Sequence, residues 1–223
     1  MESPFVHELD ALKTFLLTMA GEVEHQLELT VRSLVERDAT LAEQVIAGDA
    51  LIDRREIEAD RHIVEAIVRG RPLARDLRFV MTAGKIAPDL ERIGDHAVNI
   101  ARRSLQLSGL PPLKRLVTTP RMAAVVVGMV HDAIAAFVGG DAEKARAVIA
   151  RDDQVDAMNE ELVRELLTYM MEDPRTIARG LALAEVVRSL ERIGDQATNI
   201  AEQVIYLVEG EDVRHKRVGG GDD

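Results

Sequence analysis

The segment LERIGDHAVNIA at residues 90–101 occurs again in the same chain as LERIGDQATNIA at residues 190–201. In both copies apolar residues recur every three or four positions, which is the pattern of an amphipathic helix. A second stretch, VIAGDALID at 45–53, returns as VIARDDQVD at 148–156. Two stretches that recur in the same order predict two copies of one helical unit in tandem.

The composition favours an all-α fold. The chain has 223 residues, of which 47% are hydrophobic and only 3% aromatic, with no tryptophan. Its core must therefore consist of Leu, Val, Ile, Ala and Met, which are the side chains that helices use to pack against each other. We expect six helices, three in each copy of the repeated unit.

Residues that start or stop helices place these elements along the chain. Thr119 followed by Pro120 is a typical helix start, as are Asp141 and Asp173, and Gly48 is a candidate bend. The turn RGRP at 69–72 opens the third helix. The expected helices cover residues 5–36, 38–68, 72–107, 119–139, 141–171 and 173–208.

These boundaries predict two domains. The first is a three-helix bundle at residues 1–108, and the second is a three-helix bundle at residues 119–208. Residues 109–118 form the linker, because Gly109 followed by two prolines cannot continue a helix. The tail at residues 209–223 is rich in glycine and charge, so we expect it to be disordered.

Charge and cysteine content exclude several classes of function. The formal net charge of −11 would repel phosphate backbones, and no Lys/Arg stripe with interleaved aromatics occurs, so we expect no nucleic-acid binding. With no cysteine, any metal must be held by oxygen or by histidine nitrogen. The N-terminus lacks the basic flank and apolar run of a signal peptide, and no long apolar run predicts a membrane span. We therefore expect a soluble cytoplasmic protein.

Each half of the chain holds two pairs of acidic residues spaced four apart. Such residues lie on one face of a helix, where two carboxylates cost the helix about 0.2–0.5 kcal/mol. A solvated face explains one such pair, because charged residues normally cover the outer side of a helix. It does not explain why the acids recur at the same places in both halves. The pairs are Asp49 with Asp53, Glu91 with Asp95, Asp152 with Asp156, and Glu191 with Asp195.

A bound cation is the functional explanation for the repeated pairs. Carboxylates are hard oxygen donors, so pairs from neighbouring helices could hold magnesium, manganese, iron or zinc. Whether the two pairs of one bundle share a site stays open. Asp49 and Asp53 fall at the edge of the apolar stripe of their helix, whereas Glu91 and Asp95 fall opposite the stripe of theirs.

Three residues next to the acidic pairs have more than one interpretation. Gly94 and Gly194 each cost about 1 kcal/mol relative to Ala in a helix interior, and they leave room either for a ligand or partner or for close helix packing. His96 follows Asp95, but the second copy has Gln196. A repeated metal site cannot depend on His96, so we interpret it as a surface histidine.

The stretches VIAGDALID, RPLARDLR and DLERIGDHAVNIA, repeated more weakly in the second half, resemble the PhoU family of phosphate-signalling regulators. The resemblance runs from FVHELDAL near the N-terminus to about Val208. It implies two three-helix bundles related by pseudo-two-fold symmetry. It also implies multinuclear metal clusters, usually iron or zinc, held by the Glu/Asp-x-x-x-Asp motifs, with magnesium or manganese as alternatives. Those motifs fall on Asp49, Asp53, Glu91, Asp95, Asp152, Asp156, Glu191 and Asp195.

The resemblance further implies a cytoplasmic negative regulator of phosphate uptake that is often dimeric and is not an enzyme. Its partners would be the ATPase subunit of the phosphate ABC transporter and the phosphate-sensing histidine kinase. Two alternatives stay open from the residues alone. One is a carboxylate-cluster metalloenzyme, a hydrolase or an oxidase. The other is a purely structural helical adaptor whose acids only keep it soluble.

The two halves differ at positions that bear on these expectations. The triplet Asp76, Leu77 and Arg78 belongs to the family pattern, but the second half has Thr, Ile and Ala at 176–178. Whatever the triplet does is therefore expected in one bundle only. Pro88 lies inside the third expected helix, where it removes a hydrogen bond and predicts a kink. The second half has Arg188 at the corresponding place.

Overall fold

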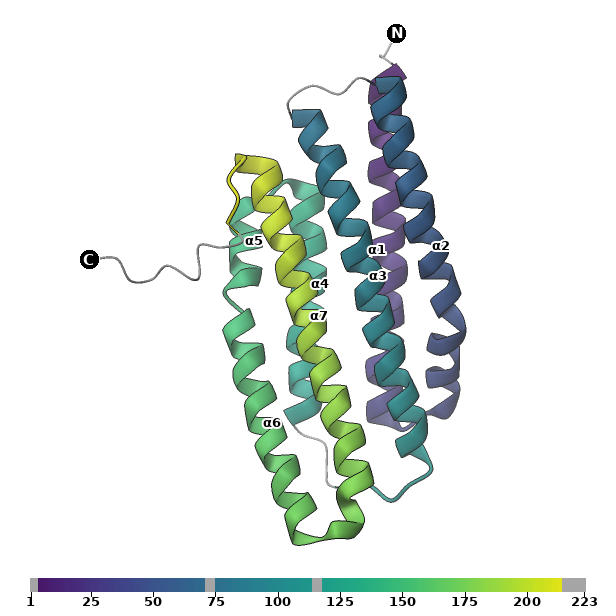
Figure 1. The fold of residues 1–223 in the computed structure, drawn as a ribbon, viewed down its shortest axis with the longest axis vertical. Coiled ribbons are helices and arrows are strands. Elements are labelled where there is room, and N and C mark those ends of the chain that lie inside the picture. The colour runs from purple at the N-terminus through teal and green to yellow at the C-terminus, as the bar shows by residue number, and fades with distance from the viewer. Residues whose placement is uncertain (1–3, 71–74, 114–117, 214–223) are drawn as a thin grey trace, which may run out of the picture.

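The computed structural model describes residues 4–70, 75–113 and 118–213, and among these it contains helices and no strand (Figure 1). The all-α prediction is thus confirmed. The predicted disorder of the tail falls mainly on residues 214–223, which lie outside the described residues. The helices are α1 (Pro4–Glu36), α2 (Ala39–Gly70), α3 (Arg75–Ser108), α4 (Thr118–Gly139), α5 (Ala142–Ile149), α6 (Asp152–Glu172), the 3-10 turn η1 (Pro174–Thr176) and α7 (Ile177–Glu209).

The two LERIGD helices, α3 and α7, lie side by side at the centre of the molecule and run in opposite directions (Figure 1). Helices α1 and α2 pack on α3, while α4, α5 and α6 pack on α7. Helix α1 also contacts α4. Each half is therefore a three-helix bundle, and the antiparallel central pair fits a pseudo-two-fold axis perpendicular to α3 and α7.

The core is continuous across both bundles. Leu16 and Leu90 of the first half belong to the same cluster of buried apolar side chains as Met129 and Leu190 of the second. A separate small cluster under α2 consists of Ala42, Val45, Val98 and Ala101. Because the main cluster includes residues from both halves, each bundle stabilises the other through the burial of apolar surface.

Three aspartates fix the starts of helices where the sequence predicts them. Asp38 accepts a hydrogen bond from the backbone N–H of Thr40 at 2.8 Å, and Asp141 accepts one from Lys144 at 2.9 Å. Asp173 caps the 3-10 turn that leads into α7. Each satisfies a backbone donor that the first turn of a helix leaves unpaired.

The middle helix of the second bundle differs from the prediction of one helix over residues 141–171. It is interrupted between Ile149 and Asp152, where the Arg151 guanidinium pairs with Asp132 of α4. That pairing ties the interruption to the neighbouring helix, and Asp152 then lies in the first turn of α6, where the helix dipole favours an acid. In the first bundle α2 is unbroken through Gly48, and α3 is unbroken through Pro88.

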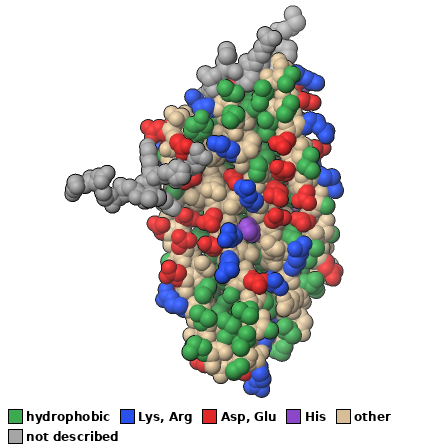
Figure 2. Space-filling model, viewed as in Figure 1, with side chains coloured by type: hydrophobic (Ala, Val, Ile, Leu, Met, Phe, Trp, Pro, Cys, Tyr) green, Lys and Arg blue, Asp and Glu red, His purple; other side chains and the backbone are tan. Residues whose placement is uncertain are grey.

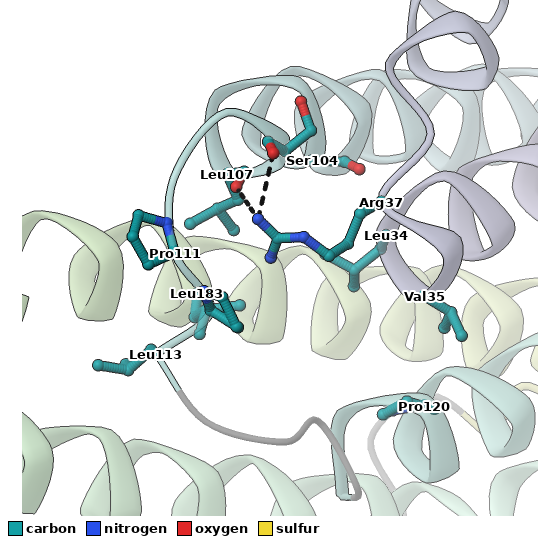
Figure 3. Close-up of a pocket in the computed structure, with 11 residues that line it drawn as sticks. Leu34, Val35, Arg37, Ser104, Leu107, Pro111, Leu113, Pro120 and Leu183 are labelled. Carbon is teal, nitrogen blue, oxygen red and sulfur yellow. Dashed lines mark hydrogen bonds between the residues drawn. The ribbon is translucent and has the colours of Figure 1, made fainter.

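Arg37 joins the α1–α2 turn to the end of α3 (Figure 3). Its backbone has a φ of 57°, a left-handed conformation that few residues other than glycine adopt. Its guanidinium donates hydrogen bonds to the carbonyl oxygens of Leu107 at 2.6 Å and Ser108 at 3.2 Å. These carbonyls lie in the last turn of α3, where the helix leaves them unpaired. The hollow beside Arg37, of about 260 Å³, is lined mainly by apolar residues such as Leu183 and Pro111.

Helix α4 is the one helix among the described residues that is long and apolar enough to cross a membrane by length and composition alone. The expectation that no segment passes this test is therefore corrected. Met122, Met129 and Val130 of α4 are fully buried in the core of the bundle. A buried core helix meets the same criterion, so its packing accounts for the apolar composition of α4.

Candidate metal centre

The two acidic pairs of the first bundle meet between α2 and α3. One carboxylate oxygen from each of Asp49, Asp53 and Asp95 lies within 4.8 Å of the other two. Glu91, one turn before Asp95, is close enough to Asp95 and Asp53 for their charges to raise its pKa, after the larger effect of burial. Three of the four acids of this bundle therefore group together, and Glu91 lies near enough for its pKa to respond to their charges.

This cluster has the donor chemistry and the spacing of a cation site. Burial is the main cause that raises the pKa of Asp49, and the charges of Asp53 and Asp95 add to it. Oxygen ligands held about 2.0–2.6 Å from one ion lie at most about 5 Å apart, which the three aspartates satisfy. A divalent cation would remove the repulsion between them. The residues present therefore fit a metal.

The acidic pairs of the second bundle meet between α6 and α7. Burial raises the pKa of Asp195 to about 6, and the charges of Glu191, Asp152 and Asp156 contribute in that order. Asp152 is 9% exposed and accepts a hydrogen bond from the Thr198 hydroxyl at 3.3 Å. In the described part of the chain, no three acids of this cluster bring their ligand atoms within 4.8 Å. The second cluster is thus more buried than the first, and its carboxylate oxygens lie further apart.

The burial in the second cluster argues against a purely solvated acidic face there. A solvated carboxylate keeps its ordinary pKa, since water stabilises the charged form. The buried position of Asp152 and the raised pKa of Asp195 show that water is partly excluded from the second cluster. Holding these acids together therefore costs the chain stability. A face whose acids only keep the protein soluble does not explain this cost.

The LERIGD glycines let the helices come close enough to form the clusters. A Cβ at Gly94 would lie 3.2 Å from Gln26 Oε1 and 3.3 Å from Ile52 Cγ2. A Cβ at Gly194 would lie 3.4 Å from Val155 Cγ1. Both glycines therefore face the helix that supplies the other acidic pair. Of the two interpretations, close helix packing is the one that the structure supports.

One acidic residue of the first cluster was missed from the sequence. The charge of Glu56 on α2 also raises the pKa of Glu91. The signal was its spacing, because residues 49, 53 and 56 follow one face of a helix at intervals of four and three. The second half has Asn159 at the corresponding place, so no repeated pair drew attention to it.

His96 lies half-buried beside α7 and outside the acidic clusters. Burial, and then the charge of Arg192, lowers its pKa, although Asp95 acts in the opposite direction. Its buried and basic surroundings separate His96 from the repeated acidic clusters. His131 contacts Glu24 at 3.0 Å and His62 packs on Phe15, so neither lies with the acidic pairs.

Comparisons with known proteins find the same domain twice in the chain. The model of the PhoU domain matches residues 16–104 and again residues 119–204. A Pseudomonas putida protein named "Phosphate-specific transport system accessory protein PhoU homolog" is 45% identical over 213 residues, which are 95% of this chain and 83% of that protein.

Two solved structures are similar over nearly their whole length. The crystal structure of PhoU from Pseudomonas aeruginosa matches with a TM-score of 0.90 and 43% identity, over 93% of this chain and 100% of that one. The phosphate transport system regulatory protein PhoU from Streptococcus pneumoniae matches with a TM-score of 0.86 and 28% identity, over 94% and 99%. The double match to the domain and the identity to the Pseudomonas putida protein mean that this chain belongs to the PhoU family.

Proposed function

We propose that this protein is a negative regulator of phosphate uptake and of the phosphate-starvation response. It acts as a metal-binding adaptor between the ATPase subunit of the phosphate ABC transporter and the phosphate-sensing histidine kinase. The observation that carries the proposal is the similarity over nearly the whole chain to proteins named as accessory or regulatory proteins of phosphate transport. In this proposal the protein works in the cytoplasm as a homodimer and catalyses no reaction.

The acidic clusters supply the metal-binding part of the proposal. Asp49, Asp53, Glu91 and Asp95 would hold one multinuclear cluster of iron or zinc, and the four acids of the second bundle would hold another. The bound metals would supply positive charge that neutralises the acids and links α2 to α3 and α6 to α7. Magnesium or manganese would suit the same oxygen donors.

Exposed apolar side chains at both ends of the molecule support the adaptor part. Each bundle presents two such residues where its second long helix ends and two where its third begins (Figure 2 shows hydrophobic side chains gathered at both ends of one face). Solvent-exposed apolar groups that recur in both copies are typical of surfaces that dock proteins. We name these two sets the apolar end patches. They are Val64, Val68, Leu77 and Met81 in the first bundle, and Leu167, Met171, Ile177 and Leu181 in the second.

Metal content tests the first half of the proposal. We expect the native chain, purified without chelator, to carry metal in elemental analysis. The variant Glu91→Gln with Asp95→Asn should lose about half of it, because two of the four ligands of one cluster are gone while the other cluster is intact. The matched control is Glu161→Gln with Glu165→Gln, which neutralises an acidic pair of the same spacing outside the clusters. Equal metal in all three proteins would remove Glu91 and Asp95 from the ligand set.

Capture of the transporter ATPase tests the second half. The variant Met81→Asp with Leu181→Asp places one charge in each apolar end patch, and we expect at least about tenfold weaker capture because a buried unpaired charge is costly at an interface. The control Val35→Asp changes an exposed apolar residue on α1 outside the patches. Undiminished capture by the double variant, at unchanged thermal stability, would show that the partner docks elsewhere.

A further inference from the structure

A basic groove runs between α3 and α7, outside the acidic clusters. It has a volume of about 350 Å³. With four arginines and one glutamate its side chains carry a net charge of +3, in a chain whose formal net charge is −11. Figure 2 shows basic side chains and a histidine gathered near the centre of this face, with acidic side chains on both sides. We call it the arginine groove; its lining residues are His96, Asn99, Arg102, Arg103, Glu185, Arg188, Ser189 and Arg192.

Most of this positive charge is not used within the chain. Arg103 pairs with Glu185 and reaches Gln106 at 3.0 Å. For Arg102, Arg188 and Arg192, the described residues provide no ion pair and no hydrogen bond within contact distance. Arg102 and Arg192 act at longer range. Arg102 lowers the pKa of Asp49, and Arg192 lowers the pKa of Asp195 and of His96. Guanidinium groups held together without anions repel one another, as like charges do in any cleft.

The second copy of the same surface shows that the fold does not require these arginines. Residues 100 positions away form the corresponding surface at the other end of the α3–α7 contact, where Arg102 is replaced by Glu202 and Arg188 by Pro88. There Arg92 pairs with Asp89 at 3.1 Å. The charge of Glu202 also acts on Asp89. One copy of the surface is therefore internally neutralised, and only the other is left with unpaired guanidinium groups.

We propose that the arginine groove binds a small anion that carries phosphoryl groups. Guanidinium groups match tetrahedral phosphoryl oxygens with paired hydrogen bonds, and the Ser189 hydroxyl and the Asn99 amide add neutral donors. A cleft lined by one sign of charge also concentrates counter-ions. The volume is more than ten times the roughly 30 Å³ of one water molecule, so the groove accommodates two linked phosphoryl groups. The proposal goes beyond the regulatory function and needs neither a bound metal nor a protein partner.

The test is calorimetric titration of the chain after metal removal, with the chelator dialysed away so that no metal can bind the anion. The probes are inorganic diphosphate, ADP, inorganic phosphate and sulfate. We expect diphosphate to bind at one site per chain and less tightly as salt increases. Equal binding of ADP would show that the phosphoryl groups alone are recognised, and tighter binding of ADP would show that a nucleotide fills the groove; either result supports the site.

Two double variants distinguish binding in the arginine groove from a general effect of positive charge on the protein. Arg102→Gln with Arg188→Gln should weaken diphosphate binding by about tenfold for each arginine removed. Arg61→Gln with Arg164→Gln removes the same charge from exposed positions on α2 and α6, and should change binding by less than about twofold. The proposal is overturned if no phosphorylated probe saturates the chain, if two sites appear per chain, or if both variants weaken binding equally. It is also overturned if only capture of the protein partner depends on Arg102 and Arg188. Loss of metal binding in the cluster variants would bear on the proposed function and not on this titration.

Discussion

Gly94→Val is expected to lower the free energy of unfolding by about 2 kcal/mol. The new Cβ would meet Gln26 Oε1 at 3.2 Å and the β-branched Ile52 at 3.3 Å, and Ile52 is buried in the core. Overpacking of a core costs about 1–3 kcal/mol, whereas replacing glycine by valine in a helix returns only a few tenths, about 0.4 kcal/mol. Chemical denaturation followed by circular dichroism at 222 nm measures the difference.

Two other glycines make this prediction specific. Gly21→Val on α1 places its Cβ where no atom lies within 4 Å, so it should be neutral or slightly stabilising. Gly194→Val meets Val155 at 3.4 Å and should fall between the two. Gly94→Val should also reduce metal binding, because α2 and α3 must move apart and separate Asp49 from Asp95. Equal stability of the Gly21 and Gly94 variants would show that close helix contact is not the reason for glycine in this motif.

Asp89→Asn is expected to raise the free energy of unfolding of the metal-free chain by about 1–2 kcal/mol at pH 8. Burial raises the pKa of Asp89 to about 6, although the Arg92 charge and hydrogen bond act against it. A shift from 3.8 to about 6 corresponds to roughly 3 kcal/mol. Part of this is offset by loss of the charged partner of Arg92, which an amide oxygen replaces only in part.

The sign of the effect follows from the raised pKa. The folded chain holds the Asp89 proton more tightly than the unfolded chain, so the favourable contribution is complete below about pH 3.8 and is lost as pH rises through about 6. The stability difference between variant and native chain should be near zero at pH 4 and should grow up to pH 8. Asp60→Asn, at an exposed position on α2, should show no such growth. A variant less stable than the native chain at pH 8 would mean that the Asp89–Arg92 ion pair is net stabilising.

The repeated motif made much of the fold predictable. Two copies of LERIGD, together with capping residues such as Asp141 and Asp173, predicted the helices and their order, because the spacing of apolar residues and the ends of helices depend on neighbouring residues. The interruption before Asp152 was not predictable. It accompanies the contact of Arg151 with Asp132 of another helix, and contacts between distant segments leave no local pattern.

The sequence identified the repeated acids but not how they are arranged in space, and their role as metal ligands stays a prediction. Repetition in one chain distinguished the eight acids from ordinary surface charge, and the structure brings the acids of each bundle near one another. Their grouping depends on the distance between α2 and α3, which Gly94 and Ile52 decide together. The arginine groove was missed for a related reason. Arg102 and Arg188 are 86 positions apart in sequence, and only the antiparallel packing of α3 on α7 brings them to one cleft.

The covalent linkage of the two bundles has a consequence for how the protein can evolve. In a symmetric homodimer built from one bundle, every mutation would appear in both subunits, so the two sites would change together. In a tandem chain each copy is encoded separately, and a mutation in one leaves the other intact. The two copies already differ in this way, since Pro88 in the first corresponds to Arg188 in the second and Arg102 corresponds to Glu202. A tandem chain thus allows one copy of a surface to change while the other copy is kept.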